Sequence, residues 1–309
     1  MPPSHAIVPV SSSDFDRVLS IAIHSVPSPR SQRAYKRALL DFFAWYQTGG
    51  HQGFSKAAVQ EYRTRLEHSG LAPSSINLKL TAIRRLAAEA ADNGLLAPEL
   101  AAGIARVKGT RGGGVRTGHW LSRAQTEQLL ALPDTMTNKG KRDRVVLAVL
   151  VGCGLRRTEL VQLKSEQIQQ LDGRWVVTNL VGKGNRLRTV PMPSWTKVVL
   201  DTWQEAAGLQ SGPILRAVNK SDRVLGNVIS PQSVFNIVTG YGIDLGIPIT
   251  PHDLRRTFAK LAHVGHAALE QIQLSLGHAS VLTTERYLGV RQDLADAPCD
   301  HLGLTVSTA

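Results

Sequence analysis

The chain has 309 residues, of which 42% are hydrophobic and 19% charged, and it carries a formal net charge of +12. This composition is that of a globular protein long enough for two cores, and it excludes a low-complexity chain. Basic residues outnumber acidic ones both before and after residue 118. The charge predicts a polyanionic partner, either a nucleic acid or an acidic membrane surface.

Two further features concern the compartment. The two cysteines, Cys153 and Cys299, offer no disulfide framework and suit a reducing environment. No apolar run approaches the ~18 residues of a membrane span, and the N-terminus lacks a signal-peptide pattern. We therefore expect a cytoplasmic protein with no membrane partner.

The first hundred residues carry helical patterns. Apolar residues at helical spacing, with Ser or Pro at the start and Gly at the end, predict helices at 28–50, 55–70 and 72–94. The third helix is amphipathic. Its apolar face consists of Ile76, Leu80, Ile83, Ala87 and Ala90.

The other face of the helix predicted at 72–94 carries Asn77, Thr81, Arg84 and Arg85. Asn77, Lys79, Arg84 and Arg85 are our candidates for contact with the polyanion. The alternative is a solvated charged face, which is the usual meaning of such charges on a helix.

A linker is predicted at 107–118. Its sequence, VKGTRGGGVRTG, is rich in glycine, basic and nearly free of large apolar side chains, which indicates a flexible charged segment. It divides the chain into a helical domain at 14–106 and a second domain at 119–309.

The second domain has a mixed pattern. Ser122 and Gln125 form a capping-box pattern that opens a helix at 121–132, and a buried helix follows at 141–154. Three short strands separated by glycine turns occupy 167–193 and predict a small antiparallel sheet. Further helices are expected at 194–207, 231–245, 252–264, 267–276 and 280–288. The predicted fold class is mainly α with a small antiparallel β-sheet, in an α+β second domain.

Four motifs carry chemical groups: GLRRTEL at 154–160, VGKGN at 181–185, HDLRRT at 252–257 and LGHASVLTTERY at 276–287. Each has an ordinary explanation when taken alone. Arg156 can cap a helix or pair with Glu159, Lys183 can be an exposed hairpin lysine, and Tyr287 can be a half-buried packing residue. The candidate site residues are Arg156, Lys183, His252, Arg255, His278 and Tyr287.

Together these residues resemble the active site of the tyrosine recombinase (phage integrase) family. The family pattern is G-x-R-x-x-E-L, a Lys on a β-turn, H-x-L-R-H/R-T, and L-G-H followed nine residues later by Tyr. This chain matches all six positions, and the resemblance extends over about residues 14–290. It implies a helical core-binding domain followed by a catalytic domain.

The resemblance also implies a mechanism. Tyr287 attacks a DNA phosphate and forms a covalent 3′-phosphotyrosine, while His252 assists proton transfer. Arg156, Arg255 and His278 bind the phosphate, and Lys183 protonates the leaving 5′-oxygen. Such a site uses no metal and no other cofactor. Glu159 is interpreted as a structural partner of Arg156.

The expected partner is double-stranded DNA with a specific recombination site. The family resemblance implies a homotetramer in the synaptic complex, strand exchange through a Holliday junction, and an association with the bacterial nucleoid. The biological role (integration, excision, resolution or transposition) and any accessory protein stay open.

Three alternatives compete with a recombinase. A type IB topoisomerase uses much the same site, but a separate helical domain and a basic linker favour a recombinase. A metal-dependent nuclease could use His252, His263, His266 and His278, but no carboxylate cluster accompanies them. A DNA-binding protein without chemistry would not require all six residues.

Overall fold

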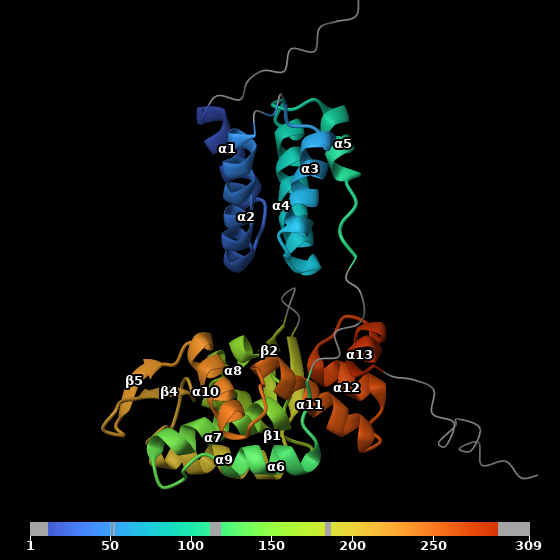
Figure 1. Ribbon diagram of the computed structural model, residues 1–309. Helices are drawn as coiled ribbons and strands as arrows, with labels where there is room; N and C mark the ends of the chain where they lie inside the picture. Colours follow the sequence, from blue (N-terminus) through green and yellow to red (C-terminus); the bar gives the residue numbers. More distant parts are fainter. Residues whose placement is uncertain (1–11, 50, 52, 112–118, 183–186, 290–309) are drawn as a thin grey trace, which may run out of the picture. The chain divides into compact units, whose positions relative to one another are not determined.

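The computed structural model describes residues 12–49, 51, 53–111, 119–182 and 187–289. The chain divides into two compact units, Met1–Arg116 and Thr117–Ala309 (Figure 1). The described parts are mostly helical, with a three-stranded and a two-stranded antiparallel sheet, so the predicted fold class is confirmed. Within them, no helix combines the length and apolar character needed to cross a membrane.

The N-terminal unit is a helical bundle. Its described helices are α1 (Ser12–His24), α2 (Pro29–Thr48), α3 (Lys56–His68), α4 (Pro73–Asp92) and α5 (Pro98–Ala105). Helix α4 contacts each of the others. All five residues of its predicted apolar face are buried, as helical spacing requires for a helix at the centre of a bundle.

An aromatic cluster joins α2 to α3. The ring centroid of Phe42, which is fully buried, lies 5.1 Å from that of Tyr62 in an edge-on arrangement, and Trp45 lies 5.0 Å from Tyr62. Such pairs contribute beyond the area that they bury. This cluster fixes α3 against α2.

The C-terminal unit is built around helix α7. Its helices are α6 (Arg123–Ala131), α7 (Asn138–Gly152), α8 (Arg157–Gln162), α9 (Ser194–Ala206), α10 (Pro231–Asp244), α11 (Pro251–Val264), α12 (Leu269–Leu276) and α13 (Val281–Leu288), with a 3₁₀ turn at Ser165–Gln167. Helix α7 is buried from Val145 to Gly152 and contacts α6, α8, α9, α10 and α11. The capping box predicted at the start of α6 is present, because Ser122 and Gln125 bond each other's backbone N–H.

The predicted sheet has the order β1-β2-β3, formed by β1 (Ile168–Leu171), β2 (Arg174–Val181) and β3 (Leu187–Pro191). Asp172 and Gly173 both have positive φ, as a two-residue hairpin turn requires. A second hairpin, β4 (Arg216–Val218) with β5 (Val224–Val228), was not predicted. Helices α1 and α5 belong to the domain predicted as helical, although neither was predicted with bounds of its own.

A small separate core holds the C-terminal helices. Ala259 of α11, Ile272 and Leu276 of α12, and Leu288 of α13 are buried together. Phe258 and Tyr287 pack against this cluster. The cluster therefore seats α13 beside α11 and brings Tyr287 close to His252, 35 residues earlier.

Candidate active site

The N-terminus of α11 presents two of the predicted residues. Thr250 precedes the helix, and its N–H and hydroxyl both donate to the Asp253 carboxylate, at 2.9 and 2.7 Å. This cap fixes the first turn, so that His252 and Arg255 lie three residues apart on one side of the helix. Partial burial and the neighbouring arginines, Arg256 first among them, lower the pKa of His252 below its usual range.

Arg255 is only 2% exposed. Its two terminal nitrogens donate to the carbonyl oxygens of Gly154 and Leu276, which lie far apart in the sequence. Burial, and then the charge of Arg156, lower the pKa of Arg255 to about 10. Arg255 therefore stays cationic at neutral pH, and it joins the loop before Arg156 to the end of α12.

Two other motif positions have structural roles, one through close packing and one through hydrogen bonds. Gly154 has a φ of 60°, and a Cβ there would lie 2.5 Å from the ring of Phe258, so only glycine fits. Thr257, the last residue of HDLRRT, accepts the N–H of Leu121 at 2.9 Å and donates to the Asp253 carbonyl at 2.9 Å. This hydroxyl fastens the beginning of the C-terminal unit to α11.

Arg156 precedes α8 as its N-cap residue, with its side chain 32% exposed. Its Nη1 donates to Glu159 Oε1 at 2.8 Å, and its backbone N–H donates to Glu159 Oε2 at 2.8 Å. Its Nη2 lies 3.4 Å from the Gly277 carbonyl oxygen. Glu159 is buried and pairs with Arg156, as their spacing predicts.

His278 follows the left-handed glycine that ends α12. Gly277 has φ and ψ of 62° and 45°, and the His278 N–H donates back to the Gln273 carbonyl at 3.2 Å. His278 Nδ1 lies 2.9 Å from Oγ1 of the buried Thr284, which leaves Nε2 for a ligand. Burial, followed by Arg255 and Arg156, lowers the pKa of His278 to about 4, so the ring is neutral at pH 7.

Tyr287 lies among these groups. Its hydroxyl donates to the His252 carbonyl at 3.3 Å, and its ring lies edge-on to the rings of His252 and His278, each with a centroid distance of 5.4 Å. Arg256 lies over the Tyr287 ring at 5.0 Å. Burial raises the pKa of the phenol to about 12, although Arg255 and Arg256 oppose the shift. The hydroxyl is thus protonated at neutral pH.

The structure brings five of the six predicted residues together: Arg156, His252, Arg255, His278 and Tyr287. The sixth, Lys183, lies outside the described residues. The strands on either side of it are paired through Val181 and Leu187.

Sequence reasoning missed three residues that contact the site: Arg188, Arg256 and Thr284. Arg256 had a signal, because it follows Arg255 on a helix that begins at the site. Arg188 and Thr284 had little, because their partners, Glu159 and His278, lie on other segments of the chain, 29 and 6 positions away. Among the described residues, no group of three or more His, Cys, Asp or Glu is arranged to hold a metal ion.

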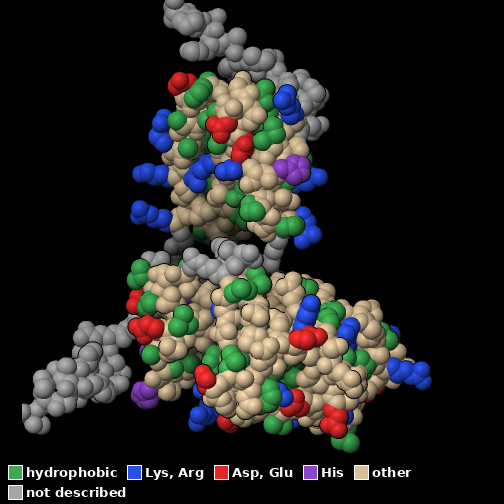
Figure 2. All heavy atoms as spheres, turned by 180° about the vertical axis from the view of Figure 1, so that it is seen from behind, with side chains coloured by type: hydrophobic (Ala, Val, Ile, Leu, Met, Phe, Trp, Pro, Cys, Tyr) green, Lys and Arg blue, Asp and Glu red, His purple; other side chains and the backbone are tan. Residues whose placement is uncertain are grey.

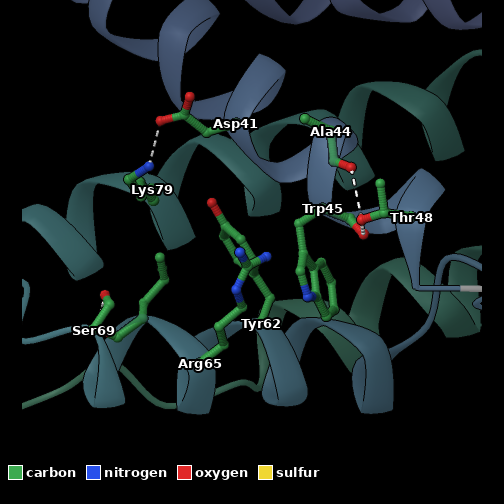
Figure 3. Close-up of a pocket in the computed structure, with 9 residues that line it drawn as sticks. Asp41, Ala44, Trp45, Thr48, Tyr62, Arg65, Ser69 and Lys79 are labelled. Carbon is green, nitrogen blue, oxygen red and sulfur yellow. Dashed lines mark hydrogen bonds and ion pairs between the residues drawn. The ribbon is translucent and has the colours of Figure 1, made fainter.

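The four candidate DNA-contact residues all have partners within the N-terminal unit. Lys79 Nζ lies 2.6 Å from Asp41 Oδ2, beside a hollow of about 410 Å³ between α2, α3 and α4. Figure 3 shows this pair together with Trp45, Tyr62 and Arg65, which line the same hollow. The ammonium of Lys79 is therefore already neutralised by a carboxylate.

Asn77 and Arg84 bind the described beginning of the predicted linker. The Asn77 amide donates to the Thr110 carbonyl and accepts its N–H, both at 2.9 Å, and Arg84 Nη2 donates to the Val107 carbonyl. Arg63 donates to the Lys108 carbonyl at 3.2 Å. Residues 107–110 thus lie along α3 and α4, whereas 112–118 lie outside the described residues.

Arg85 is the exposed member of the four. Its Nε donates to Ser25 Oγ at 2.8 Å, and its Nη2 lies 3.0 Å from Glu89. Figure 2 shows Lys and Arg side chains spread over the N-terminal unit. Contact between any of the four residues and DNA stays a prediction.

The chain is similar to known proteins over both units. The model of the phage integrase family matches residues 119–293, and that of the phage integrase N-terminal SAM-like domain matches residues 15–94. A tyrosine recombinase of Synechococcus elongatus is 30% identical over 97% of this chain and 96% of its own length. Tyrosine recombinase XerD of Pseudomonas putida is 36% identical over 55% of this chain and 57% of its own.

Solved structures share the fold. XerH bound to a palindromic difH substrate, in a post-cleavage complex, aligns with a TM-score of 0.67 at 20% identity, covering 92% of this chain and 82% of that one. A lambda integrase dimer bound to a COC′ core site aligns with a TM-score of 0.66 at 17% identity, covering 89% and 93%.

The matched family is one of DNA breaking and rejoining enzymes that act in site-specific recombination. The chain belongs to the phage integrase family of tyrosine recombinases.

Proposed function

We propose that Tyr287 is the nucleophile with which this recombinase cleaves a specific site in double-stranded DNA. The observation that carries the proposal is the position of its hydroxyl, 3.3 Å from the His252 carbonyl, with both histidine rings and Arg256 around the phenol ring. The phenolic oxygen attacks phosphorus, the bond to the 5′-oxygen breaks, and a 3′-phosphotyrosine forms. Attack by the freed 5′-hydroxyl reverses these steps and rejoins a strand without ATP.

Arg156 and Arg255 supply the positive charge for the phosphorane. Guanidinium groups stay charged at neutral pH and can each donate two hydrogen bonds to phosphate oxygens. His278 adds a third donor through Nε2 in the tautomer in which its Nδ1 accepts a hydrogen bond from the Thr284 hydroxyl, because the neutral ring then carries its proton on Nε2. Donors fixed before the substrate binds stabilise developing charge without the cost of reorganisation.

Two protons must move during cleavage. Tyr287 has to lose its proton on attack, since its pKa is about 12. The lowered pKa of His252 leaves its ring neutral at pH 7 and able to accept that proton. Lys183, as the family resemblance suggests, gives a proton to the leaving 5′-oxygen.

Substitution of the nucleophile tests the proposal. A duplex with a nick next to the scissile phosphate releases a short fragment on cleavage, so the covalent protein–DNA adduct accumulates. Tyr287→Phe removes the attacking oxygen alone and should give no adduct, with DNA affinity and thermal stability retained. Tyr35→Phe, in the other unit, is the matched control and should react normally. Adduct formation by Tyr287→Phe at the unmodified yield would contradict the role.

The N-terminal unit is proposed to bind the same DNA through its basic surface. Each phosphate contact made by Lys or Arg contributes about 0.9 to the slope of log affinity against log salt concentration. Arg85→Ala should therefore reduce that slope by about 1. An unchanged slope would assign Arg85 to a solvated face only.

We further propose that four copies assemble on two sites and exchange strands in two steps through a Holliday junction. Sedimentation of the protein on one-site and two-site DNA tests the assembly. A complex of four protomers is expected when two sites are present, and no more than two protomers on one site.

A further inference from the structure

Arg188 of β3 is an arginine with a buried side chain that contacts residues of the candidate active site. Its side chain is 9% exposed. Its Nη1 and Nη2 donate to the two oxygens of Glu159, at 3.0 and 2.8 Å, which is a bidentate pair. Its Nε donates to the Ser275 carbonyl at 3.0 Å. One side chain thus joins β3, α8 and the end of α12.

The Glu159 carboxylate is shared between two arginines. Arg156 binds it with its Nη1 and its backbone N–H, and Arg188 binds it with both terminal nitrogens. Burial would raise the pKa of Glu159, but the hydrogen bonds from Arg188 and Arg156 outweigh it and lower the pKa to about 2. The carboxylate is therefore ionised throughout the physiological range.

The turn that carries His278 rests on the same guanidinium. A Cβ added to Gly277 would lie 3.0 Å from Arg188 Cδ and 3.1 Å from its Nε. Gly277 also accepts from Arg156 Nη2 at 3.4 Å. The turn, Arg156 and Arg188 are therefore packed into one cluster.

The charges of this cluster have a consequence for Arg156. Without Arg188, Arg156 and Glu159 would form a neutral pair, and Arg255 would be the main cation left for the phosphate. With Arg188 present, two cations share one anion, and a net positive charge remains. Arg188 is buried against Ser275 and Glu159, so that charge is expressed at Arg156, the exposed member of the pair.

We infer that Arg188 is a positioning residue for DNA cleavage: it balances Glu159 so that Arg156 keeps its charge and orientation toward the scissile phosphate, and it braces the turn before His278. The inference rests on the proposed function. It concerns a residue that touches no substrate and acts through Glu159.

The test uses Arg188→Gln, Arg188→Lys and Arg156→Ala in the full-length protein, with Arg174→Gln as the matched control. Arg174 is an exposed arginine of the same sheet. Single-turnover cleavage of the nicked duplex is measured with DNA affinity and melting temperature. Misplaced catalytic groups typically cost ~10²-fold in rate. We expect about that loss for Arg188→Gln at unchanged DNA affinity, a smaller loss for Arg188→Lys, and none for Arg174→Gln.

A second substrate separates positioning from general damage. Replacing one non-bridging oxygen of the scissile phosphate by a methyl group removes its negative charge, so cleavage depends less on Arg156. The rate defects of Arg156→Ala and Arg188→Gln should both shrink by at least about tenfold on this substrate. A defect caused by lost stability would be the same on both substrates.

If Arg188→Gln does not fold, Glu159→Gln with Arg188→Gln tests the same idea, because it removes the unbalanced carboxylate as well. This double variant should be stable and, because no carboxylate is left to neutralise Arg156, it should cleave the normal phosphate faster than Arg156→Ala does. A rate as low as that of Arg156→Ala would contradict the charge balance. A normal rate for Arg188→Gln, or an equal defect on both substrates, would overturn the inference. Absence of cleavage by the unmodified protein would instead contradict the proposed function.

Discussion

The guanidinium of Arg256 lies 5.0 Å from the centre of the Tyr287 ring. A cation over an aromatic face is attracted by the ring, and it also stabilises the negative charge of a phenolate. Among the charges around the phenol, Arg255 and Arg256 are the two cations that oppose the rise in its pKa most strongly. Arg256 therefore helps to hold the Tyr287 ring in place and favours loss of the proton from the Tyr287 hydroxyl.

Arg256→Leu should slow cleavage by about fivefold, because a contact of this kind contributes about 1 kcal/mol. Its rate should also rise with pH over a higher range than that of the unmodified protein, because burial and then Arg256 lower the pKa of His252, and loss of Arg256 lets that pKa rise. Single-turnover cleavage between pH 6 and 10 measures both effects. Lys260→Leu is the control, because Lys260 lies over the ring of Trp120, on the same helix and outside the site. Equal behaviour of the two variants would contradict the role of Arg256.

Lys183 should be needed only when the leaving group requires a proton. A sugar alkoxide leaves poorly, so loss of a general acid should cost about 10²–10⁴ in rate. If the bridging 5′-oxygen is replaced by sulfur, the leaving thiol has a pKa of about 8.5 and departs without protonation.

Lys183→Ala should therefore cleave the normal site slowly and the sulfur-bridged site at nearly the unmodified rate. Arg156→Ala should be slow on both, because the phosphorane needs its charge whichever atom leaves. Cleavage of both sites at the normal rate by Lys183→Ala would mean an exposed lysine without a catalytic role.

The ionised Glu159 should make the C-terminal unit sensitive to acid. The pKa of Glu159 is about 2 in the folded chain, whereas its ordinary value is 4.5. A lowered pKa stabilises the fold above pH 4.5, and this stability is lost as the pH falls from 4.5 toward 2. Between pH 6 and pH 3, the unmodified protein should lose about 2 kcal/mol more free energy of unfolding than Glu159→Gln. Urea unfolding at each pH measures this, and parallel curves for the two proteins would contradict it.

The contacts of Asn77 and Arg84 should protect the chain after α5 from proteolysis. Trypsin cleaves after Lys and Arg in extended, accessible segments, and Lys108 is held through its carbonyl by Arg63. Asn77→Ala with Arg84→Ala should speed cleavage after Lys108 several-fold, because a segment freed from its hydrogen bonds opens more often. Mass spectrometry of timed digests identifies the site. Arg85→Ala, the neighbouring control, should leave the cleavage rate unchanged.

The sequence predicted those features that depend on local pattern. The apolar face of α4 follows from helical spacing, and the capping box of α6 from two residues three positions apart. Helix α5 was not predicted with bounds of its own, because its sequence PELAAGIA contains a glycine and has only eight residues. Its helical conformation therefore depends on packing against the rest of the unit. A Cβ added to Gly103 would lie 3.6 Å from Lys56 Cβ, which is ordinary van der Waals contact, so α5 packs directly against the start of α3.

The candidate site divides in the same way. The motifs pointed to Arg156, His252, Arg255, His278 and Tyr287, because each has a side chain suited to phosphate chemistry at a fixed spacing. Arg188 could not be found in this way, because its role depends on contacts with Glu159, 29 positions earlier, and Ser275, 87 positions later. Likewise, the sequence shows the charges of Lys79 and Arg84, but not that Lys79 pairs with Asp41 and Arg84 binds the Val107 carbonyl.

The burial of Arg255 makes the two phosphate-binding arginines unequal. Arg156 is open to water along a third of its side chain, whereas Arg255 is enclosed and uses two of its N–H groups on backbone carbonyls. Free guanidinium ion from solution can enter the space left by Arg156→Ala and restore part of its cleavage. In Arg255→Ala, by contrast, the ion would have to enter a buried space and also replace the two hydrogen bonds that connect Gly154 with the end of α12, which we expect it not to do. Added guanidinium should therefore restore cleavage by Arg156→Ala but not by Arg255→Ala. Arg255 holds the site together as well as supplying a positive charge.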